Sequence, residues 1–388
     1  MGDVNIGKAR EISGQLGDLL LLTPALRAAK ESFPQSFVSV LVVERRNSDE
    51  SKQHPFNDLT ATSAERESSV LSTNKNVDEL LGLNRQALRA LSGLARVRAE
   101  LAIIKFLRRK RFDTVICTFP EDRFVQWAFA SGARVRVGQR KQGLHWLLTH
   151  KPNIEKSQRG VLKYYCDLVR VVGATVHSTQ TEYIVPESSK QWADDVLRSK
   201  NISTTRQVVA IHPGASGDYK IWPPERYALL IDHLAKKGLQ VLLLNGAIDE
   251  QIISEIRKRV QHSFVEVRAG NRVGDLAAII QRCRLCIAND SGPRHLAIAV
   301  GTSSLAFFRQ HHAKEWGVYE ENNLLATLKA SGQCPVCPPD VCLDMIPEGE
   351  RFASHCLRMI CVEEAVQQLE KMLGLRPRRG DRRVKRAS

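Results

Sequence analysis

Four short segments of the chain combine small residues with charged ones, and each lies where an apolar run ends or a helix-like run begins. They are SGQLGD (13–18), HPGASGDYK (212–220), NGAIDE (245–250) and NDSGPRH (289–295). In doubly wound sheets, ligands bind beyond the carboxyl ends of the strands. The residues of these segments are therefore the first candidates for binding and catalysis.

The last segment follows the apolar run LCIAN and precedes a helix-like run. Pro293 suits the first helical turn, where its missing N–H is no loss. The N–H groups of Ser291 and Gly292 would then form an anion site at a helix N-terminus. Asp290 would repel a phosphate, so we expect it to face neutral hydroxyls such as those of a sugar. His295 either reaches the same pocket or is an ordinary helix histidine.

The two middle segments carry a cation and two carboxylates. Around Lys220, glycine and serine residues leave backbone N–H groups able to face an anion, and the lysine adds a compact positive charge. This pattern favours a phosphate contact over a solvated lysine. Asp249 and Glu250 lie at a predicted helix start, where they either complement the helix dipole or accept hydrogen bonds from ribose hydroxyls.

The first segment ends in a carboxylate next to a predicted helix start. Gly14 and Gly17 allow the backbone to turn tightly and to approach a ligand. Asp18 either caps the helix that follows or is held at a cleft, where it could accept a proton.

Short apolar runs alternate with helix-period segments along the chain. The runs are FVSVLVV (37–43), FDTVICTF (112–119), VVAIHPG (208–214), LQVLLLNG (239–246) and LCIAND (285–290). This alternation predicts an α/β protein with parallel sheets covered on both faces.

The series of strands and helices runs twice, which predicts two doubly wound, Rossmann-like domains facing a central cleft. We expect an N-terminal domain over residues 1–185 and a C-terminal domain over residues 186–375. The polar, aperiodic stretch 47–76 is expected to be a mobile surface insertion. Residues 376–388 form a basic tail.

The charge of the chain indicates anionic partners. The 388 residues carry a formal net charge of +15, which suits phosphorylated substrates, an acidic membrane face or nucleic acid. Nucleic acid is disfavoured because aromatic residues are only 6% and none interleave with the arginines of the tail. The tail is either a disordered solubilising end or a contact with an anionic membrane. No apolar run is long enough to span a membrane and no signal peptide is apparent, so a cytoplasmic protein is expected.

Five of the nine cysteines cluster near the C-terminus. They are Cys334, Cys337, Cys342, Cys356 and Cys361. Only one CxxC pair is present, so the zinc-ribbon pattern is not met. We expect reduced thiols in a long loop and no metal, with a metal site as the alternative.

An anion site, a carboxylate for sugar hydroxyls, a second carboxylate for a ribose and a base together describe a nucleotide-sugar transferase. The chain resembles glycosyltransferase family 9, the ADP-heptose:lipopolysaccharide heptosyltransferases, over most of residues 10–370. The resemblance rests on four strings: GQLGDLLLLTPALRAAK (14–30), HPGASGDYKIWPPERYALLIDHL (212–234), NGAIDE (245–250) and NDSGPRHLAIAVGT (289–302).

The resemblance implies a GT-B fold and metal-independent, inverting transfer of heptose from ADP-heptose. It implies no cofactor, and as acceptor the Kdo or heptose part of the lipopolysaccharide inner core at the inner leaflet of the membrane. Asp18 matches the family's proposed base. The positions that match donor-binding residues are Lys220 for the diphosphate, Glu250 for the ribose, and Asp290, Ser291, Gly292 and His295 for heptose and phosphate.

Three departures from the family pattern leave alternatives open. Residues 3–13 are charged where a buried first strand is expected, Arg294 stands where the family has methionine, and FFRQHHAKEW (307–316) replaces an FGPT-like turn. The alternatives are a transferase for another nucleotide sugar or acceptor, and a catalytically silent binding module. A nicotinamide-dependent oxidoreductase is disfavoured because no GxGxxG follows any predicted strand.

Overall fold

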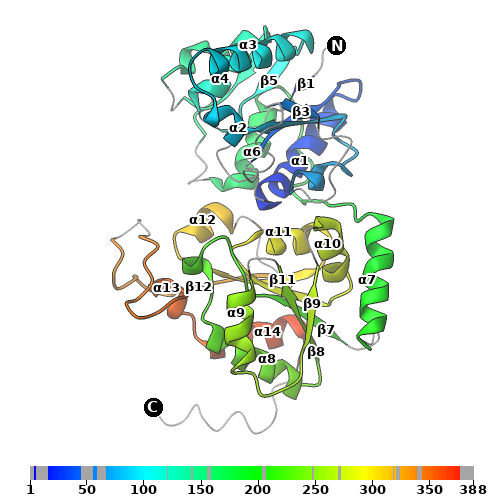
Figure 1. Cartoon of the computed structure of the whole chain (residues 1–388), viewed down its shortest axis with the longest axis vertical. Coiled ribbons are helices and arrows are strands. Elements are labelled where there is room, and N and C mark those ends of the chain that lie inside the picture. The colour runs from blue at the N-terminus through cyan, green and yellow to red at the C-terminus, as the bar shows by residue number, and fades with distance from the viewer. Residues whose placement is uncertain are drawn as a thin grey trace. The chain divides into compact units, whose positions relative to one another are not determined.

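The computed structural model describes most of the chain in two compact units. The described residues are 4–5, 16–44, 56–58, 67–119, 121–140, 143–154, 159–202, 207–246, 249–269, 272–317, 319, 324–338 and 343–375. The N-terminal unit comprises Met1–Glu187 with Asn271–Gly274, and the C-terminal unit comprises Ser188–Gly270 with Asp275–Ser388 (Figure 1).

The N-terminal unit contains two small sheets. One has the order β1-β5-β6 and is parallel, and the other has the order β2-β4-β3, in which β2 and β4 are parallel and β3 is antiparallel. The strands are β1 (Val4–Asn5), β2 (Ser39–Glu44), β3 (Phe56–Asp58), β4 (Glu79–Asn84), β5 (Thr114–Ile116) and β6 (Val135–Val137). The helices are α1 (Leu16–Ser32), η2 (Glu67–Leu71), α2 (Arg85–Ala90), α3 (Gly93–Arg109), α4 (Asp122–Ala130), η3 (His145–Leu147) and α6 (Val161–Arg170).

The first turns of helix α1 are mostly apolar, and all residues from Leu16 to Leu26 are buried. Pro24 within the helix cannot donate a hydrogen bond to the carbonyl of Leu20. The hydroxyl of Thr23 donates to that carbonyl instead, at 2.7 Å. The helix therefore continues past the proline, and its apolar sequence makes it a core element of the unit.

Part of the predicted insertion belongs to the packed N-terminal unit. Residues 56–58 form β3, and Val70 and Leu71 in η2 are buried. Asn76 is also buried and donates from its side chain to Glu182 at 2.8 Å. Residues 67–76 therefore pack on the rest of the unit through two apolar side chains and a satisfied amide, while the predicted mobility of the stretch stays a prediction. Most of the stretch before them lies outside the described residues.

The C-terminal unit is built on one six-stranded parallel sheet with the order β12-β11-β10-β7-β8-β9. Its strands are β7 (Val208–His212), β8 (Gln240–Asn245), β9 (Val265–Arg268), β10 (Leu285–Asn289), β11 (Ser303–Phe308) and β12 (Leu325–Lys329). Its helices are α7 (Glu187–Ser199), η4 (Asp218–Lys220), α8 (Pro224–Lys236), α9 (Glu250–Arg257), α10 (Val273–Gln281), α11 (Gly292–Ala299), α12 (His312–Trp316), α13 (His355–Arg358) and α14 (Val362–Leu373).

The strand order of this sheet fixes where a ligand can bind. All six strands are parallel. From the middle of the sheet, β7, β8 and β9 follow one another toward one edge, and β10, β11 and β12 follow one another toward the other edge. The order therefore reverses between β7 and β10, and the loops beyond the carboxyl ends of these two strands flank the crevice of a Rossmann-type sheet. The four inner strands β7, β8, β10 and β11 are almost continuously buried, as expected for a sheet covered by helices on both faces, whereas the edge strands β9 and β12 are only partly buried (Figure 1).

The sequence prediction of an α/β fold with parallel sheets is confirmed. The N-terminal unit differs in detail because its sheet is split and β3 is antiparallel. The first strand, β1, is only two residues long, and the charged residues that follow it lie outside the described residues. Within the residues that the structure describes, no helix is long and apolar enough to cross a membrane.

Candidate active site

Asn289 joins the two loops at the switch point of the C-terminal sheet. It is fully buried at the end of β10. Its Oδ1 accepts hydrogen bonds from the Trp222 backbone N–H at 3.1 Å and the Tyr227 hydroxyl at 2.8 Å, and its Nδ2 donates to the Pro213 carbonyl at 2.5 Å. These bonds hold the loop after β7 beside the residue that follows Asn289, which is Asp290.

The side chains of Lys220 and His312 converge on Asp290. Its Oδ2 lies 3.8 Å from Lys220 Nζ and 3.8 Å from His312 Nδ1. These distances are too long for direct hydrogen bonds. Asp290 Oδ2 and His312 Nδ1 are both buried, and neither has a hydrogen-bond partner within the described part of the chain. A buried polar atom without a partner is costly, so this arrangement suits a ligand group that bonds to all three side chains.

Two buried arginines add positive charge near this point. Arg294 donates to the Thr327 hydroxyl at 2.8 Å and to the Trp316 carbonyl at 3.3 Å, and its guanidinium lies 4.5 Å from the centre of the Phe308 ring. Arg309 is also buried, so both charges are held inside the unit. The positive charge of a guanidinium is retained on burial, because its pKa is above any physiological pH.

Aromatic and acidic partners make the burial of Arg309 possible. The guanidinium lies 4.7 Å from the centre of the Tyr219 ring and forms an ion pair with Asp344. Tyr219 immediately precedes Lys220 in η4. Arg309 thus links the turn after β11 to the turn that carries Lys220.

The positive environment affects two histidines. Burial, Arg309 and Lys220 lower the pKa of His312 to about 3. Burial, Arg294 and Lys220 lower the pKa of His295 well below its usual value, and its Nδ1 lies 3.1 Å from the Tyr319 hydroxyl. Both rings are neutral at physiological pH. The same field that disfavours an imidazolium would stabilise a bound anion.

The helix after Asp290 adds backbone donors. Ser291 is the N-cap residue of α11, and Gly292 is the first residue of this eight-residue helix. The Ser291 side chain makes no cap hydrogen bond and instead donates to the Asn289 carbonyl at 3.3 Å. The N–H groups of the first turn are therefore not occupied by the cap side chain, as expected for an anion site.

The two acids after β8 have different environments. Asp249 is buried, accepts from the Gly246 N–H at 2.9 Å, and packs so closely on Gly214 that a Cβ there would lie 1.8 Å from Asp249 Oδ1. It therefore organises the two loops. Glu250 is exposed and accepts from the Asn245 amide at 3.2 Å. Of the two, Glu250 is the carboxylate that a ligand can reach.

Asp18 belongs to the N-terminal unit and is only 2% exposed. Helix α1 begins at Leu16, so Asp18 lies inside the first turn. The alternative that Asp18 is the N-cap residue is therefore wrong, although an acid in the first turn still interacts favourably with the helix dipole. A buried carboxylate in a first turn is compatible with the predicted role as base, which stays a prediction.

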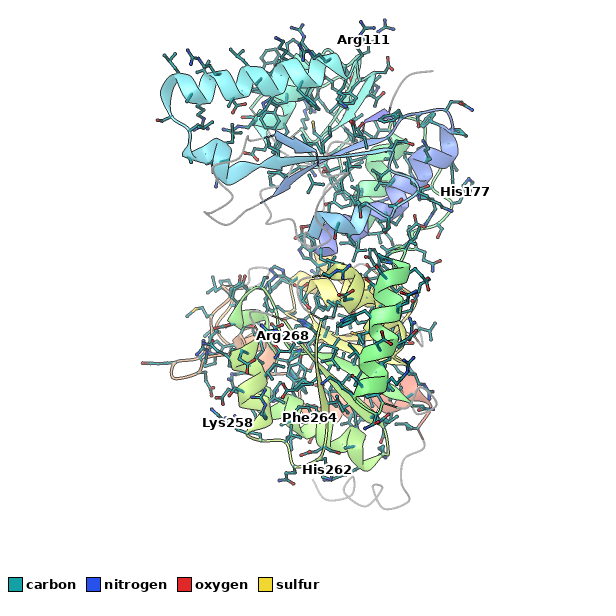
Figure 2. All side chains as sticks on the ribbon, turned by 45° about the vertical axis from the view of Figure 1, so that its right-hand side comes forward. Arg111, His177, Lys258, His262, Phe264 and Arg268 are labelled. Carbon is teal, nitrogen blue, oxygen red and sulfur yellow. The ribbon has the colours of Figure 1, made fainter. Side chains whose placement is uncertain are left out.

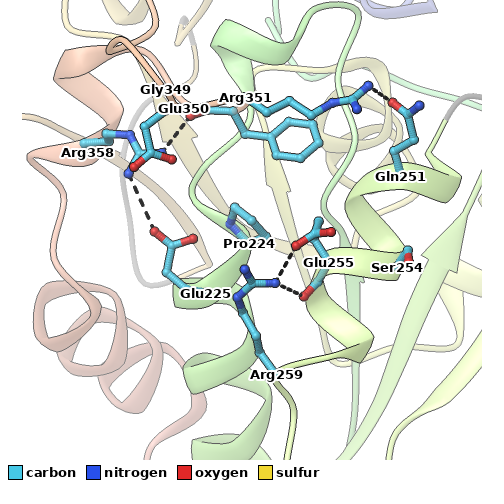
Figure 3. Close-up of a pocket in the computed structure, with 11 residues that line it drawn as sticks. Pro224, Glu225, Gln251, Ser254, Glu255, Arg259, Gly349, Glu350, Arg351 and Arg358 are labelled. Atoms are coloured by element: carbon cyan, nitrogen blue, oxygen red, sulfur yellow. Dashed lines mark hydrogen bonds and ion pairs between the residues drawn. The ribbon is translucent and has the colours of Figure 1, made fainter.

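The pocket shown in Figure 3 is separate from the predicted site residues. It has a volume of about 400 Å³ and is lined by the start of α8, by one side of α9 with Arg259 beyond it, and by the segment 349–358. Its charged side chains neutralise one another: Arg259 lies 2.6 Å from Glu255, and Arg358 lies 2.8 Å from Glu350. None of the predicted site residues lines this pocket.

Three of the clustered cysteines pack together. Cys334, Cys337 and Cys356 are buried with Ala330 in a small apolar cluster. Cys337 Sγ accepts from the Leu343 N–H at 3.4 Å. Among the residues that the structure describes, no three His, Cys, Asp or Glu side chains are arranged to hold a metal. Cys342 lies outside the described residues.

The cysteine cluster gives a testable expectation. The purified, reduced protein should contain substoichiometric zinc and iron, measured by elemental analysis, and should keep its activity after treatment with a chelator. Stoichiometric metal that is lost together with activity would contradict this expectation. Cys334, Cys337, Cys342 and Cys356 would then be the first ligands to replace.

A Rossmann-type sheet with buried cations, a helix N-terminus and a carboxylate at its switch point suits a ligand that carries both phosphate and hydroxyl groups. Residues 100–336 match the model of glycosyltransferase family 9 (heptosyltransferase), which is more than half of the chain. The protein belongs to this family and is a glycosyltransferase.

Relatives and solved structures agree with this assignment. Lipopolysaccharide heptosyltransferase 3 of Escherichia coli is 23% identical over 317 residues, which cover 79% of this chain and 84% of the relative. The family 9 glycosyltransferase of Veillonella parvula has a TM-score of 0.71 at 20% identity, covering 96% of this chain and 97% of that one. The E. coli ADP-heptose lps heptosyltransferase II has a TM-score of 0.66 at 17% identity, covering 95% and 98%. The predicted GT-B fold is confirmed.

The predicted site residues divide between the two units. The C-terminal unit brings Lys220 and Asp290 together with Ser291 and Gly292, and His295 lies on the same helix N-terminal region. Glu250 follows the neighbouring strand β8, and Asp18 lies in the other unit. His312 and Arg309 were not predicted. Their signal in the sequence was the unusual string FFRQHH, which places three basic or titratable residues after a strand.

Proposed function

We propose that the protein transfers heptose from ADP-heptose to the Kdo or heptose part of the lipopolysaccharide inner core, with inversion and without a metal. The observation that carries the proposal is the convergence of Lys220, His312 and Asp290 at the switch point of a positively charged sheet edge. A diphosphate needs the cation and the helix N-terminus, and a sugar hydroxyl needs the carboxylate.

The donor is proposed to bind mainly to the C-terminal unit. Lys220 and the N–H groups at Ser291 and Gly292 would neutralise the diphosphate, Glu250 would accept from the ribose, and Asp290 would accept from the sugar. Support comes from a solved relative, the E. coli heptosyltransferase WaaC with ADP-2-deoxy-2-fluoro heptose, which has a TM-score of 0.64 at 16% identity over 96% of this chain and 99% of that one. No resident cofactor is proposed.

The proposed mechanism is a single displacement at the anomeric carbon. The carboxylate of Asp18 takes the proton of the acceptor hydroxyl as that hydroxyl attacks, and ADP leaves from the opposite face of the sugar. Lys220 and the first turn of α11 stabilise the charge that develops on the leaving diphosphate. His295 is neutral, so it would act as a hydrogen-bonding group and not as a second cation.

The acceptor determines where the protein would work. A lipopolysaccharide core acceptor is presented at the inner leaflet, so we propose a cytoplasmic protein in peripheral contact with the inner membrane. The basic tail, residues 376–388, is proposed to add attraction to anionic lipids. No nucleic-acid partner is proposed.

The alternatives have specific support in the turn after β11. Arg309 and His312 occupy the place of the FGPT-like turn, and Arg294 replaces methionine. These changes favour either another nucleotide sugar or a silent binding module as the runner-up. Incubation with ADP-heptose, other ADP-sugars, UDP-sugars and GDP-sugars distinguishes a heptosyltransferase, a transferase for another nucleotide sugar and a silent binding module. ADP-heptose should be consumed fastest in the presence of a truncated core acceptor, and consumption of a different donor alone would overturn the proposed donor.

Replacement of His312 tests whether the turn after β11 contacts the nucleotide. His312→Ala should weaken ADP binding by about 10- to 100-fold, the usual effect of losing a hydrogen bond to a charged group. Because the pKa of His312 is about 3, its ring is neutral above pH 5, so the loss should be the same across pH 5–8. Calorimetric titration measures it. His311→Ala is the matched control, and equal affinities of the two variants would exclude His312 from the site.

A further inference from the structure

Helix α3 of the N-terminal unit has an apolar outer face. Leu94, Val97 and Leu101 are 75%, 53% and 58% exposed. Their spacing of three and four residues places them on one side of the helix. The opposite side is packed, since Ile103 and Leu107 are buried in the core. The exposure therefore belongs to a well-anchored helix whose outer face nothing in the described chain covers.

Basic residues continue the same face toward the C-terminal end of α3. Lys105, Arg108 and Arg109 are exposed, and Arg111 follows the helix and is exposed too. Arg98 is also exposed, but it lies earlier in the helix, between Val97 and Leu101. Figure 2 shows Arg111 near the end of α3, with its side chain pointing away from the ribbon. The outer face is thus mainly apolar in its first turns, apart from Arg98, and cationic in its last turns.

Acidic residues do not offset this charge. The only acid between residues 93 and 111 is Glu100. Its carboxylate accepts from the Trp127 indole at 2.9 Å and lies 3.6 Å from Arg123, so it is turned toward α4. Among the basic residues, Lys110 forms an ion pair with Glu79 and so belongs to the packed side.

We propose that α3 is a membrane-docking surface that lies on anionic phospholipid. The apolar turns around Leu94 and Leu101 would enter the boundary between headgroups and acyl chains, and the basic turns from Lys105 to Arg111 would contact lipid phosphates. A helix with an apolar stretch and a cationic stretch on one exposed face has the chemistry of an interfacial helix. The proposal names the surface for the peripheral contact of the proposed function, but it does not depend on heptose transfer.

Other occupants fit the surface less well. The exposed apolar residues of α3 are aliphatic and provide no ring on which a nucleic-acid base could stack. A second copy of the chain would bring two sets of basic residues together, and this like-charge contact is unfavourable. An anionic lipid surface satisfies both the aliphatic and the basic residues.

Vesicle co-sedimentation of the full chain tests the proposal without any donor or acceptor. The vesicles contain phosphatidylglycerol with phosphatidylethanolamine, or phosphatidylcholine alone. The first variant replaces Leu94, Val97 and Leu101 with Ser. The second replaces Lys105, Arg108 and Arg109 with Gln. The matched controls are Leu229→Ser, at an exposed leucine of α8, and the pair Arg198→Gln and Lys200→Gln, at exposed positions at the end of α7.

The native chain should bind the anionic vesicles and not the phosphatidylcholine vesicles. The Ser variant should bind them at least about tenfold more weakly at both low and high salt, because it loses apolar contact. The Gln variant should lose binding at low salt, with a difference that shrinks at high salt. The controls should bind as the native chain does. Since the basic tail is unchanged in every variant, these differences report on α3 alone.

Two outcomes would overturn the proposal. One is unchanged vesicle binding by both α3 variants, with circular dichroism showing that they are folded. The other is a change of oligomeric state by the Ser variant, measured by sedimentation velocity, with vesicle binding unaltered, which would make the apolar face a contact between copies. Either outcome leaves the proposed transfer reaction untouched, because that reaction is measured with donor and acceptor in solution.

Discussion

Lys220→Ala is expected to lower kcat/KM for ADP-heptose by about 30- to 1,000-fold, which corresponds to about 2 to 4 kcal/mol of transition-state stabilisation. The physical reason is the position of its ammonium group, which is largely buried and lies 3.8 Å from Asp290 in a site whose other cations are held by their own partners. Without Lys220, the negative charge of the leaving diphosphate would lie near the Asp290 carboxylate, and no other side-chain cation among the described residues of the site would be available to neutralise it.

Steady-state kinetics with ADP-heptose and a truncated core acceptor measures this effect. Lys220→Arg tests whether charge alone is sufficient, because the guanidinium is larger and planar. Lys236→Ala, at an exposed position of α8, is the control and should behave like the native enzyme. Native kinetics for Lys220→Ala would remove Lys220 from the donor site.

Asp18→Asn is expected to lower kcat by about 10²- to 10⁴-fold while the affinity for ADP changes little. Asparagine has nearly the same size as aspartate, but it cannot take up a proton at neutral pH. The change also removes an acid from the first turn of α1, which costs about 0.3 to 1 kcal/mol of stability. The loss of turnover should therefore be far larger than the loss of stability.

A matched variant separates catalysis from helix stability. Asp122 lies in the first turn of α4 and accepts from the Leu144 N–H at 3.0 Å. Asp122→Asn should change thermal stability by a similar small amount and leave kcat unchanged. An Asp18→Asn enzyme that folds, binds ADP and still turns over at nearly the native rate would exclude Asp18 as the base.

The sequence predicts the C-terminal unit well because the physical signals there are local. Short apolar runs such as VVAIH and LCIAN, each followed by turn residues, favour buried strands of a covered sheet, and they form β7 and β10. Pro293 lies in the first turn of α11, as its fixed backbone angle predicts. The order of the strands is not local, since it depends on which helices cross which face, and only the structure gives the switch point.

The environment of each polar side chain could not be predicted in the same way. Asp249 and Glu250 are adjacent, yet one is buried against Gly214 and the other is exposed. The burial of Arg294 in helix α11 depends on Phe308 of β11 and Thr327 of β12. A charge in the sequence therefore indicates a candidate residue, whereas its partners from distant segments determine what it can do.

Residues 67–76 pack on the N-terminal unit although their sequence pattern does not predict it. The region around residues 67–76 is polar and aperiodic, and it nevertheless packs through Val70, Leu71 and Asn76. Two apolar side chains are too few to produce a period. The amide of Asn76 is satisfied by Glu182, more than a hundred residues later in the chain, and such a contact leaves no signal in the local sequence.

The most direct test of the account is the acceptor-dependent release of ADP from ADP-heptose by the purified protein, with mass spectrometry of the acceptor. ADP should appear only when a truncated lipopolysaccharide core is present, in equal amount with a core product heavier by one heptose. Release of no ADP with any core acceptor, by a protein that turns over a different nucleotide sugar or only binds the nucleotide, would contradict it.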